Sequence, residues 1–155
     1  MQGADRVGGW RNHFNRCERW QSRAQSALND LSNTEFHEAL DFALAYFVWC
    51  HSLRDWLLKD GALKRDDLDA QLASYPQWSI VRDVANRSKH LKITMKSKDA
   101  EWSMSREYDP LAVVIEGRER CHLNLFFDGK KHRLSEVVGL AGEMWRKILS
   151  DEGLI

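Results

Sequence analysis

The chain has 155 residues, and its 23 Lys and Arg balance 23 Asp and Glu, so the formal net charge at pH 7 is zero. This length suits one domain with a full hydrophobic core and is too short for two. A neutral chain is no general binder of polyanions, so any contact with RNA or DNA must come from a local patch. Seven Trp and six Phe are many for this length and predict a large core and an aromatic interface.

The cysteines Cys17, Cys50 and Cys121 are odd in number and far apart, and none forms a Cys-x-x-Cys pair. This spacing argues against a zinc site or a disulfide framework and fits a reducing compartment. We therefore expect buried thiols, no metal, no cofactor and a cytoplasmic location. The most apolar stretch, Ala43 to Cys50, is too short to span a bilayer, and no secretory leader is visible, so no membrane association is expected.

The first half of the chain predicts four helices. Residues 1–9 contain three glycines and predict a loose tail, whereas residues 10–155 predict a single domain. The apolar positions of the first helix recur at helical spacing, at Trp10, Phe14, Cys17, Trp20, Ala24, Ala27 and Leu31. Ser32 and Glu35 have the spacing of a capping box, and Gly61 is a candidate left-handed cap, so the second helix should end at Lys59. Its nearly all-apolar middle predicts a central helix.

A short third helix is predicted over residues 66–74, and Pro76 suits the first turn of a fourth, which should end near Leu91 or Lys92. The period then changes to two. Strands are predicted at 102–108, 111–115 and 121–127, with turns at Gly117 and Asp128-Gly129. A last helix is predicted from Ser135 to about 150. The fold class is therefore mainly α (α+β): a helical bundle with a small antiparallel β-meander, inserted at about residues 101–128, before the C-terminal helix.

Polar side chains gather in the fourth predicted helix. Residues three, four and seven positions apart share one face of a helix, which groups Asp83, Asn86, Arg87 and His90. The opposite face is expected to carry Trp78, Val81, Ala85 and Ser88.

This stripe has the residue types for phosphate chemistry. His90 is a candidate acid or base near neutral pH, and Arg82 or Arg87 a candidate phosphate ligand. Asn86 and Asp83 are candidates to orient the substrate, and Lys89 is a further binding candidate. The alternative is an ordinary wet face, in which Asp83 and Arg87 form an i,i+4 pair worth about 0.2–0.5 kcal/mol.

A second polar cluster, His51, Arg54 and Asp55, lies at the polar end of the second predicted helix. His51 and Asp55 are four residues apart, so the carboxylate is placed to hold one imidazole tautomer. The alternative is a helix-end cluster that satisfies only its own neighbours. A functional role requires this cluster to face the fourth helix.

Two resemblances bear on these residues. Arg82-Asp83 followed by His90 loosely resembles the signature of HEPN domains, helical bundles that often dimerise and whose ribonuclease members cut RNA without metal through an Arg, a polar residue and a His. Seven residues separate Arg82 from His90, which is more than in that signature. On a helix these two residues lie roughly 80° apart.

The segment Ala85-Asn86-x-Ser88-Lys89-His90-Leu91 and the upstream run from His51 to Leu57 are more closely similar to a widespread set of uncharacterised prokaryotic and phage proteins. The similarity covers about residues 36–92 and implies a HEPN-like helical core without an established activity. We expect a HEPN-like member of a microbial or phage conflict system, a metal-independent ribonuclease or nucleotide-binding protein that acts as a homodimer. The alternative is a non-catalytic interaction module whose polar stripe binds a second copy or a protein partner.

Overall fold

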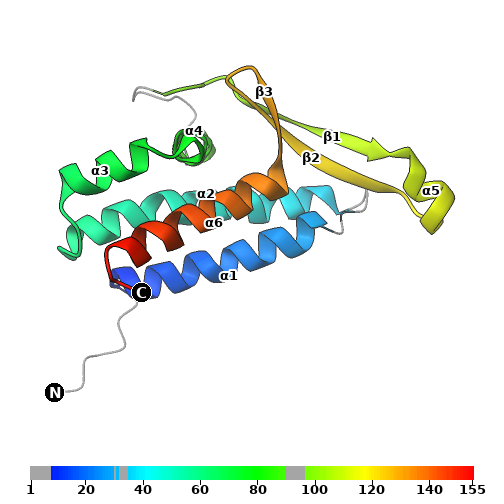
Figure 1. Ribbon diagram of the computed structural model, residues 1–155. Helices are drawn as coiled ribbons and strands as arrows, with labels where there is room; N and C mark the ends of the chain where they lie inside the picture. The colour runs from blue at the N-terminus through cyan, green and yellow to red at the C-terminus, as the bar shows by residue number, and fades with distance from the viewer. Residues whose placement is uncertain (1–7, 30, 32–34, 90–96) are drawn as a thin grey trace.

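The computed structural model describes residues 8–29, 31, 35–89 and 97–155. Its elements are, in chain order, α1 (Trp10–Asn29), α2 (Phe36–Lys59), α3 (Arg65–Ala73), α4 (Pro76–Lys89), β1 (Ser103–Asp109), α5 (Pro110–Glu116), β2 (Arg120–Phe127), β3 (Lys130–Arg133) and α6 (Leu134–Asp151). The predicted fold class, mainly helical with a small antiparallel sheet before the last helix, is confirmed (Figure 1).

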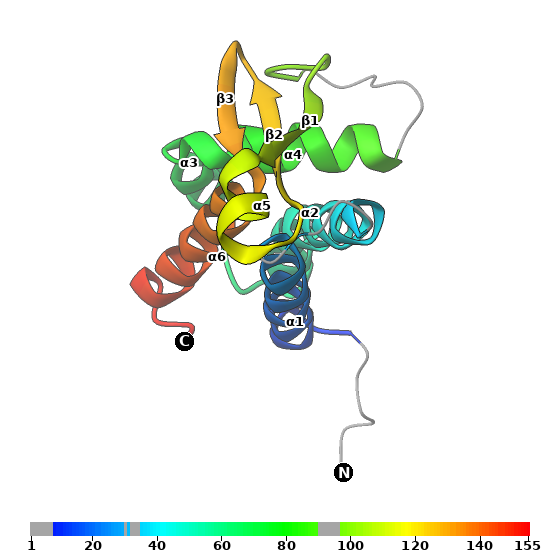
Figure 2. The ribbon, with the colours of Figure 1, turned by 90° about the vertical axis from the view of Figure 1, so that its right-hand side faces the viewer.

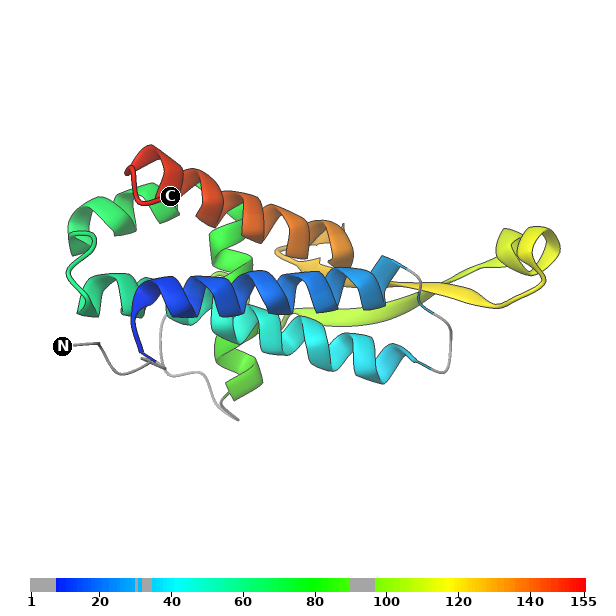
Figure 3. The ribbon, with the colours of Figure 1, turned by 90° about the horizontal axis from the view of Figure 1, so that it is seen from below.

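The bundle is built on α2. Helix α1 packs beside α2 along its length, α6 lies against both, and α4 crosses α2 (Figure 3). The centre of α2 is buried at Ala43, Tyr46, Phe47 and Cys50, as its all-apolar sequence predicts. Cys17 and Cys50 are buried and free, as their place among apolar residues predicts, and Cys121 is buried and free as well.

Helix α1 buries polar residues that its apolar period did not single out. His13 and Gln21 are 1% and 4% exposed, whereas Trp20 is only partly buried. Both polar side chains have main-chain partners: His13 Nε2 lies 2.8 Å from the carbonyl oxygen of Trp49, and Gln21 Nε2 donates to that of Val138 at 3.4 Å. Buried polar groups are tolerated when they are hydrogen-bonded. The buried face of α1 therefore includes His13 and Gln21 in place of the predicted Phe14 and Trp20.

The sheet has the order β1-β2-β3, and all its pairs are antiparallel. Strand β2 buries one side at Cys121, Leu123, Leu125 and Phe127, which confirms the predicted alternation. The turn at Asp128-Gly129 has φ angles of 50° and 74°, the left-handed pair that a two-residue type I′ hairpin requires.

The prediction of a strand at residues 111–115 is wrong, because this segment forms the helix α5. The carboxylate of Asp109 accepts the N–H of Leu111 at 3.0 Å, Pro110 occupies the first turn, and Gly117, with φ 69°, ends the helix. The β-branched run misled the prediction, although the Asp-Pro and Gly signals that bracket it are those of a helix. Helix α5 therefore sits at the tip of a two-stranded arm that projects from the bundle (Figures 1 and 3), and Figure 2 views the arm from this tip.

The remaining boundaries agree closely. Helix α6 begins at Leu134 with Arg133 as its N-cap, so the predicted cap Ser135 lies inside the helix. The predicted capping residue Ser32, most of the predicted tail (residues 1–7) and the predicted end of the fourth helix after Lys89 lie outside the described residues.

Candidate functional site

Asp83 and Arg87 both contact the segment before β1, as their shared side of the helix predicts, but Asp83 does not belong to an exposed polar stripe. Its side chain is fully buried. One carboxylate oxygen accepts the main-chain N–H groups of Lys98 and Asp99 at 2.6 and 2.7 Å, and the other accepts Arg82 Nε at 2.8 Å. Because a buried carboxylate needs such donors, Asp83 anchors the segment that leads into β1 and is not free to orient a substrate.

Arg87 is engaged with the same segment. Its guanidinium stacks over the Trp102 ring, 4.9 Å from the ring centre, and donates to the carbonyl oxygen of Trp102. Trp102 in turn donates its indole N–H to the carbonyl oxygen of Asp83 at 3.3 Å. Arg87 thus fixes the approach to β1, which leaves Arg82 as the better of the two predicted phosphate ligands.

The other predicted residues of α4 divide by exposure. Asn86 is partly buried, Lys89 is exposed, and Trp78, Val81 and Ala85 are buried as expected. Ser88 is exposed, against the prediction, and its hydroxyl donates to the carbonyl oxygen of Val84 at 2.6 Å. His90 lies outside the described residues, so its catalytic role stays a prediction.

His51 faces α4, the arrangement that a role for the second cluster requires. Its ring stacks on Trp78 of α4, with 5.4 Å between ring centres and 28° between planes. The Nδ1 atom is buried and has no hydrogen-bond partner. The predicted pairing of Asp55 with this nitrogen is therefore absent, because Asp55 accepts a bond from Arg54 at 3.1 Å instead.

The surroundings of His51 keep its imidazole neutral. Burial, followed by the cations of Lys89, Arg54 and Arg82, lowers its pKa to about 4, and Asp55 opposes them. The positive charges around this ring favour a bound anion and disfavour protonation of the imidazole. The α2–α4 face is therefore suited to hold a phosphate beside an unprotonated histidine.

Arg54 itself is committed to structure. It makes a two-pronged contact with Asp69 of α3 at 2.7 and 2.9 Å, which raises the pKa of Arg54 and lowers that of Asp69. Sequence spacing did not single out Asp69, because the contact joins α2 to α3 and no local pattern reports it. Arg54 contributes positive charge to the face and is fixed in place.

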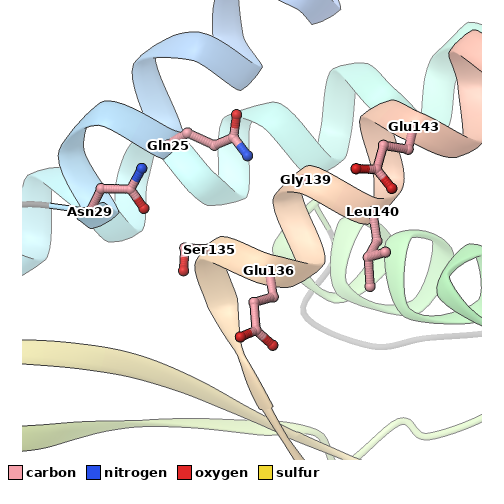
Figure 4. A pocket seen from close by; sticks show the side chains of 7 residues that line it. All are labelled: Gln25, Asn29, Ser135, Glu136, Gly139, Leu140 and Glu143. Atoms are coloured by element: carbon pink, nitrogen blue, oxygen red, sulfur yellow. The ribbon is translucent and has the colours of Figure 1, made fainter.

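Two hollows of the described surface lie away from the α2–α4 face. One, of about 450 Å³, is lined by Gln25 and Asn29 of α1 and by residues of α6 on both sides of Gly139 (Figure 4). The other, of about 530 Å³, lies between α1 and α2 near Phe42. Neither is lined by a predicted site residue.

No family model, no curated protein and no solved structure matches the chain. Within residues 8–29, 31, 35–89 and 97–155, no three His, Cys, Asp or Glu side chains are grouped to hold a metal ion. In the same ranges, no helix has the length and apolar character needed to cross a membrane.

Proposed function

We propose that the α2–α4 face binds a phosphate group of RNA or of a nucleotide, and that the chain is a HEPN-like metal-independent ribonuclease. The neutral His51, stacked on Trp78 among cations, is the observation that carries this proposal. Arg82 and Lys89 hold the phosphate. The Arg82 guanidinium donates to the Asp83 carboxylate through Nε at 2.8 Å, and its terminal nitrogens are the proposed phosphate donors.

In the cleavage step, unprotonated His51 takes the proton of the ribose 2′-hydroxyl, and the 2′-oxygen attacks phosphorus. The bond to the 5′-oxygen breaks, a 2′,3′-cyclic phosphate forms, and His90 gives a proton to the leaving oxygen. Asn86 orients the phosphate. Because the pKa of His51 is about 4, cleavage should persist well below pH 6.5.

The similarity of the sequence to prokaryotic and phage proteins supports a role in a microbial or phage conflict system, with a homodimer as the acting form. In such a dimer the α4 surfaces of two copies would lie close together, which would turn an open helix face into a cleft.

The test is cleavage of a 5′-labelled RNA in the presence of EDTA by the protein and by His51→Ala, His90→Ala and Arg82→Gln. We expect cleavage that each substitution lowers at least tenfold, with a cyclic phosphate at the new 3′ end. The matched control is His37→Ala, an exposed histidine at the start of α2. Absence of cleavage and of nucleotide binding, or full activity of the His51 and His90 variants, would overturn the proposal.

A second candidate, the interaction module, is favoured by α5. Its residues Leu111, Val113, Val114 and Ile115 are 52–82% exposed at the tip of the projecting arm (Figure 3). Such a contiguous apolar patch is typical of a protein contact. Replacing Val114 and Ile115 with Lys should leave the free energy of unfolding unchanged and abolish self-association in sedimentation velocity; a wild-type monomer at high concentration would count against a homodimer.

A further inference from the structure

A row of aromatic rings capped by cations lies where α1 packs beside α2. The guanidinium of Arg16 lies over Trp49 at 5.0 Å, that of Arg23 over Trp20 at 4.9 Å, and the Lys59 ammonium over Trp56 at 5.8 Å, each measured to the ring centre. The rings themselves are partly buried. We call these six side chains the α1–α2 seam.

The seam is one continuous strip. Trp49 and Trp56 are seven residues apart on α2, so they share one side of the helix with about 10 Å between them along its axis. The same interval leads back to Phe42, whose ring lies 5.9 Å from that of Trp20 on α1. His13 contacts the rings of both Trp49 and Trp56 and fixes their spacing.

This strip is separate from the proposed phosphate site. His51, two residues after Trp49, points toward Trp78 of α4. Two positions along a helix differ by about 200°, so the seam and the α2–α4 face lie on nearly opposite sides of α2.

The charge on the α1 side of the seam is positive. Helix α1 carries four arginines, and its single acidic residue, Glu18, pairs with Arg146 of α6 at 2.9 Å. Carboxylates lie at the two ends of the seam: Glu35 and Glu38 line the hollow that includes Arg23, and Asp60 accepts the N–H of Trp10 at the start of α1. The middle of the strip therefore offers cations and aromatic faces without a neighbouring acid on α1, although the whole chain is neutral.

We infer that the α1–α2 seam binds single-stranded RNA. Bases stack on Arg planes as well as on aromatic rings, whatever their sequence, and the guanidinium groups of Arg16 and Arg23 offer such planes above the Trp rings that they cover. The same arginines neutralise the phosphates. Rings already covered by cations present little bare hydrocarbon, so they suit a polyanion with flat bases better than an apolar protein surface. Binding here goes beyond cleavage at the α2–α4 face, since it would hold the strand and leave the chemistry to the other side of α2.

The test is fluorescence anisotropy with a 2′-fluoro RNA 12-mer, which cannot be cleaved through a 2′-hydroxyl, at 50 mM and 200 mM salt. We expect Arg16→Gln/Arg23→Gln to weaken binding about tenfold or more and to flatten the salt dependence by roughly 0.7 log unit per lost phosphate contact. Arg23→Gln alone should give part of the loss. It serves as the variant least exposed to a folding defect, because Arg16 also contacts His13.

The matched control is Arg65→Gln at the exposed start of α3, which should bind within twofold of the unaltered protein. Tryptophan fluorescence should change on binding, since the guanidinium groups that take the bases lie directly over the Trp20 and Trp49 rings. The inference fails if the unaltered protein shows no binding up to about 100 μM at low salt, if Arg65→Gln loses as much as the seam variants, or if a duplex binds as tightly as the single strand. Binding of this probe that Arg23→Gln weakens, without cleavage of an all-ribose strand by the unaltered protein, would support the seam and overturn the proposed ribonuclease. Cleavage by the unaltered protein, with probe binding that Arg23→Gln leaves unchanged, would do the reverse.

Discussion

The buried carboxylate of Asp83 on α4 accepts the main-chain N–H of Asp99 at 2.7 Å, and the Asp99 carboxylate in turn accepts the N–H of Asp128 at 2.9 Å. Two carboxylates in series thus tie α4 to the turn between β2 and β3. Lys98 strengthens the connection with an ion pair to Asp128 at 3.6 Å. The sheet, and with it the arm that carries α5, is therefore registered on the same helix that carries the candidate phosphate ligands.

Asp83→Asn should be strongly destabilising. The amide keeps the shape of the side chain but replaces one of its two acceptor oxygens with NH₂, and both oxygens are needed, one by the two main-chain donors and the other by Arg82. Losing one charge-assisted bond and leaving a buried donor unpaired costs on the order of 2–4 kcal/mol. Urea unfolding measures the loss, and Glu143→Gln, an exposed acid on α6, is the control. A change below about 0.5 kcal/mol would show that Asp83 is not the anchor described above.

Stability should fall with acid through His51. Its pKa is about 4 in the folded chain and 6.5 in the unfolded chain, so between these values the unfolded state binds more protons. The free energy of unfolding is therefore at its full value above pH 6.5 and declines as the pH falls toward 4, by at most about 3 kcal/mol from this group. Burial also lowers the pKa of His13, which adds loss in the same direction.

The check is the slope of unfolding free energy against pH in urea titrations. His51→Gln should flatten the slope between pH 6.5 and 4 and leave the part due to His13. His37→Gln, at an exposed position of α2, should keep the slope of the unaltered protein. Equal slopes for all three proteins would mean that His51 is not buried as a neutral ring.

The described helices other than α5, and two of the three predicted strands, could be predicted from the sequence because their signals are local. Helical period, Pro76 and Gly61 bracket α2 and α4, and alternation marks β2. The burial of Asp83 could not be read in the same way. Its donors, at Lys98 and Asp99, lie 15 and 16 residues further along the chain, and a helical wheel places an aspartate on the polar side whenever its neighbours are polar.

The candidate site was predicted in part for the same reason. The spacing of His51 and Asp55 marks His51 as a candidate site residue on α2. A role for it requires contact with α4, and its ring does stack on Trp78 of that helix. Its true neighbours are Trp78 and a set of cations, and the expected carboxylate Asp55 turns to Arg54. Side-chain pairing between helices depends on their crossing geometry, which the periodicity of either helix alone does not contain.

Gly142 should resist substitution where its neighbour Gly139 tolerates it better. A Cβ at Gly142 would lie 2.2–2.5 Å from the amide group of Gln21, whereas one at Gly139 would meet Gln25 Nε2 at 3.0 Å. Gln21 is buried and held by two bonds, to Val138 and from Arg146, so its side chain cannot yield cheaply. Both Gly→Ala changes gain about 1 kcal/mol of helix propensity, so their difference isolates the packing of α1 on α6.

We expect Gly142→Ala to lose about 1–3 kcal/mol of unfolding free energy relative to Gly139→Ala in urea titrations, because overpacking costs that much in a close-packed interface. Gly142→Ala combined with Gln21→Ala should recover much of the loss, and equal stability of the two single variants would mean that α1 and α6 are not in close contact at this position.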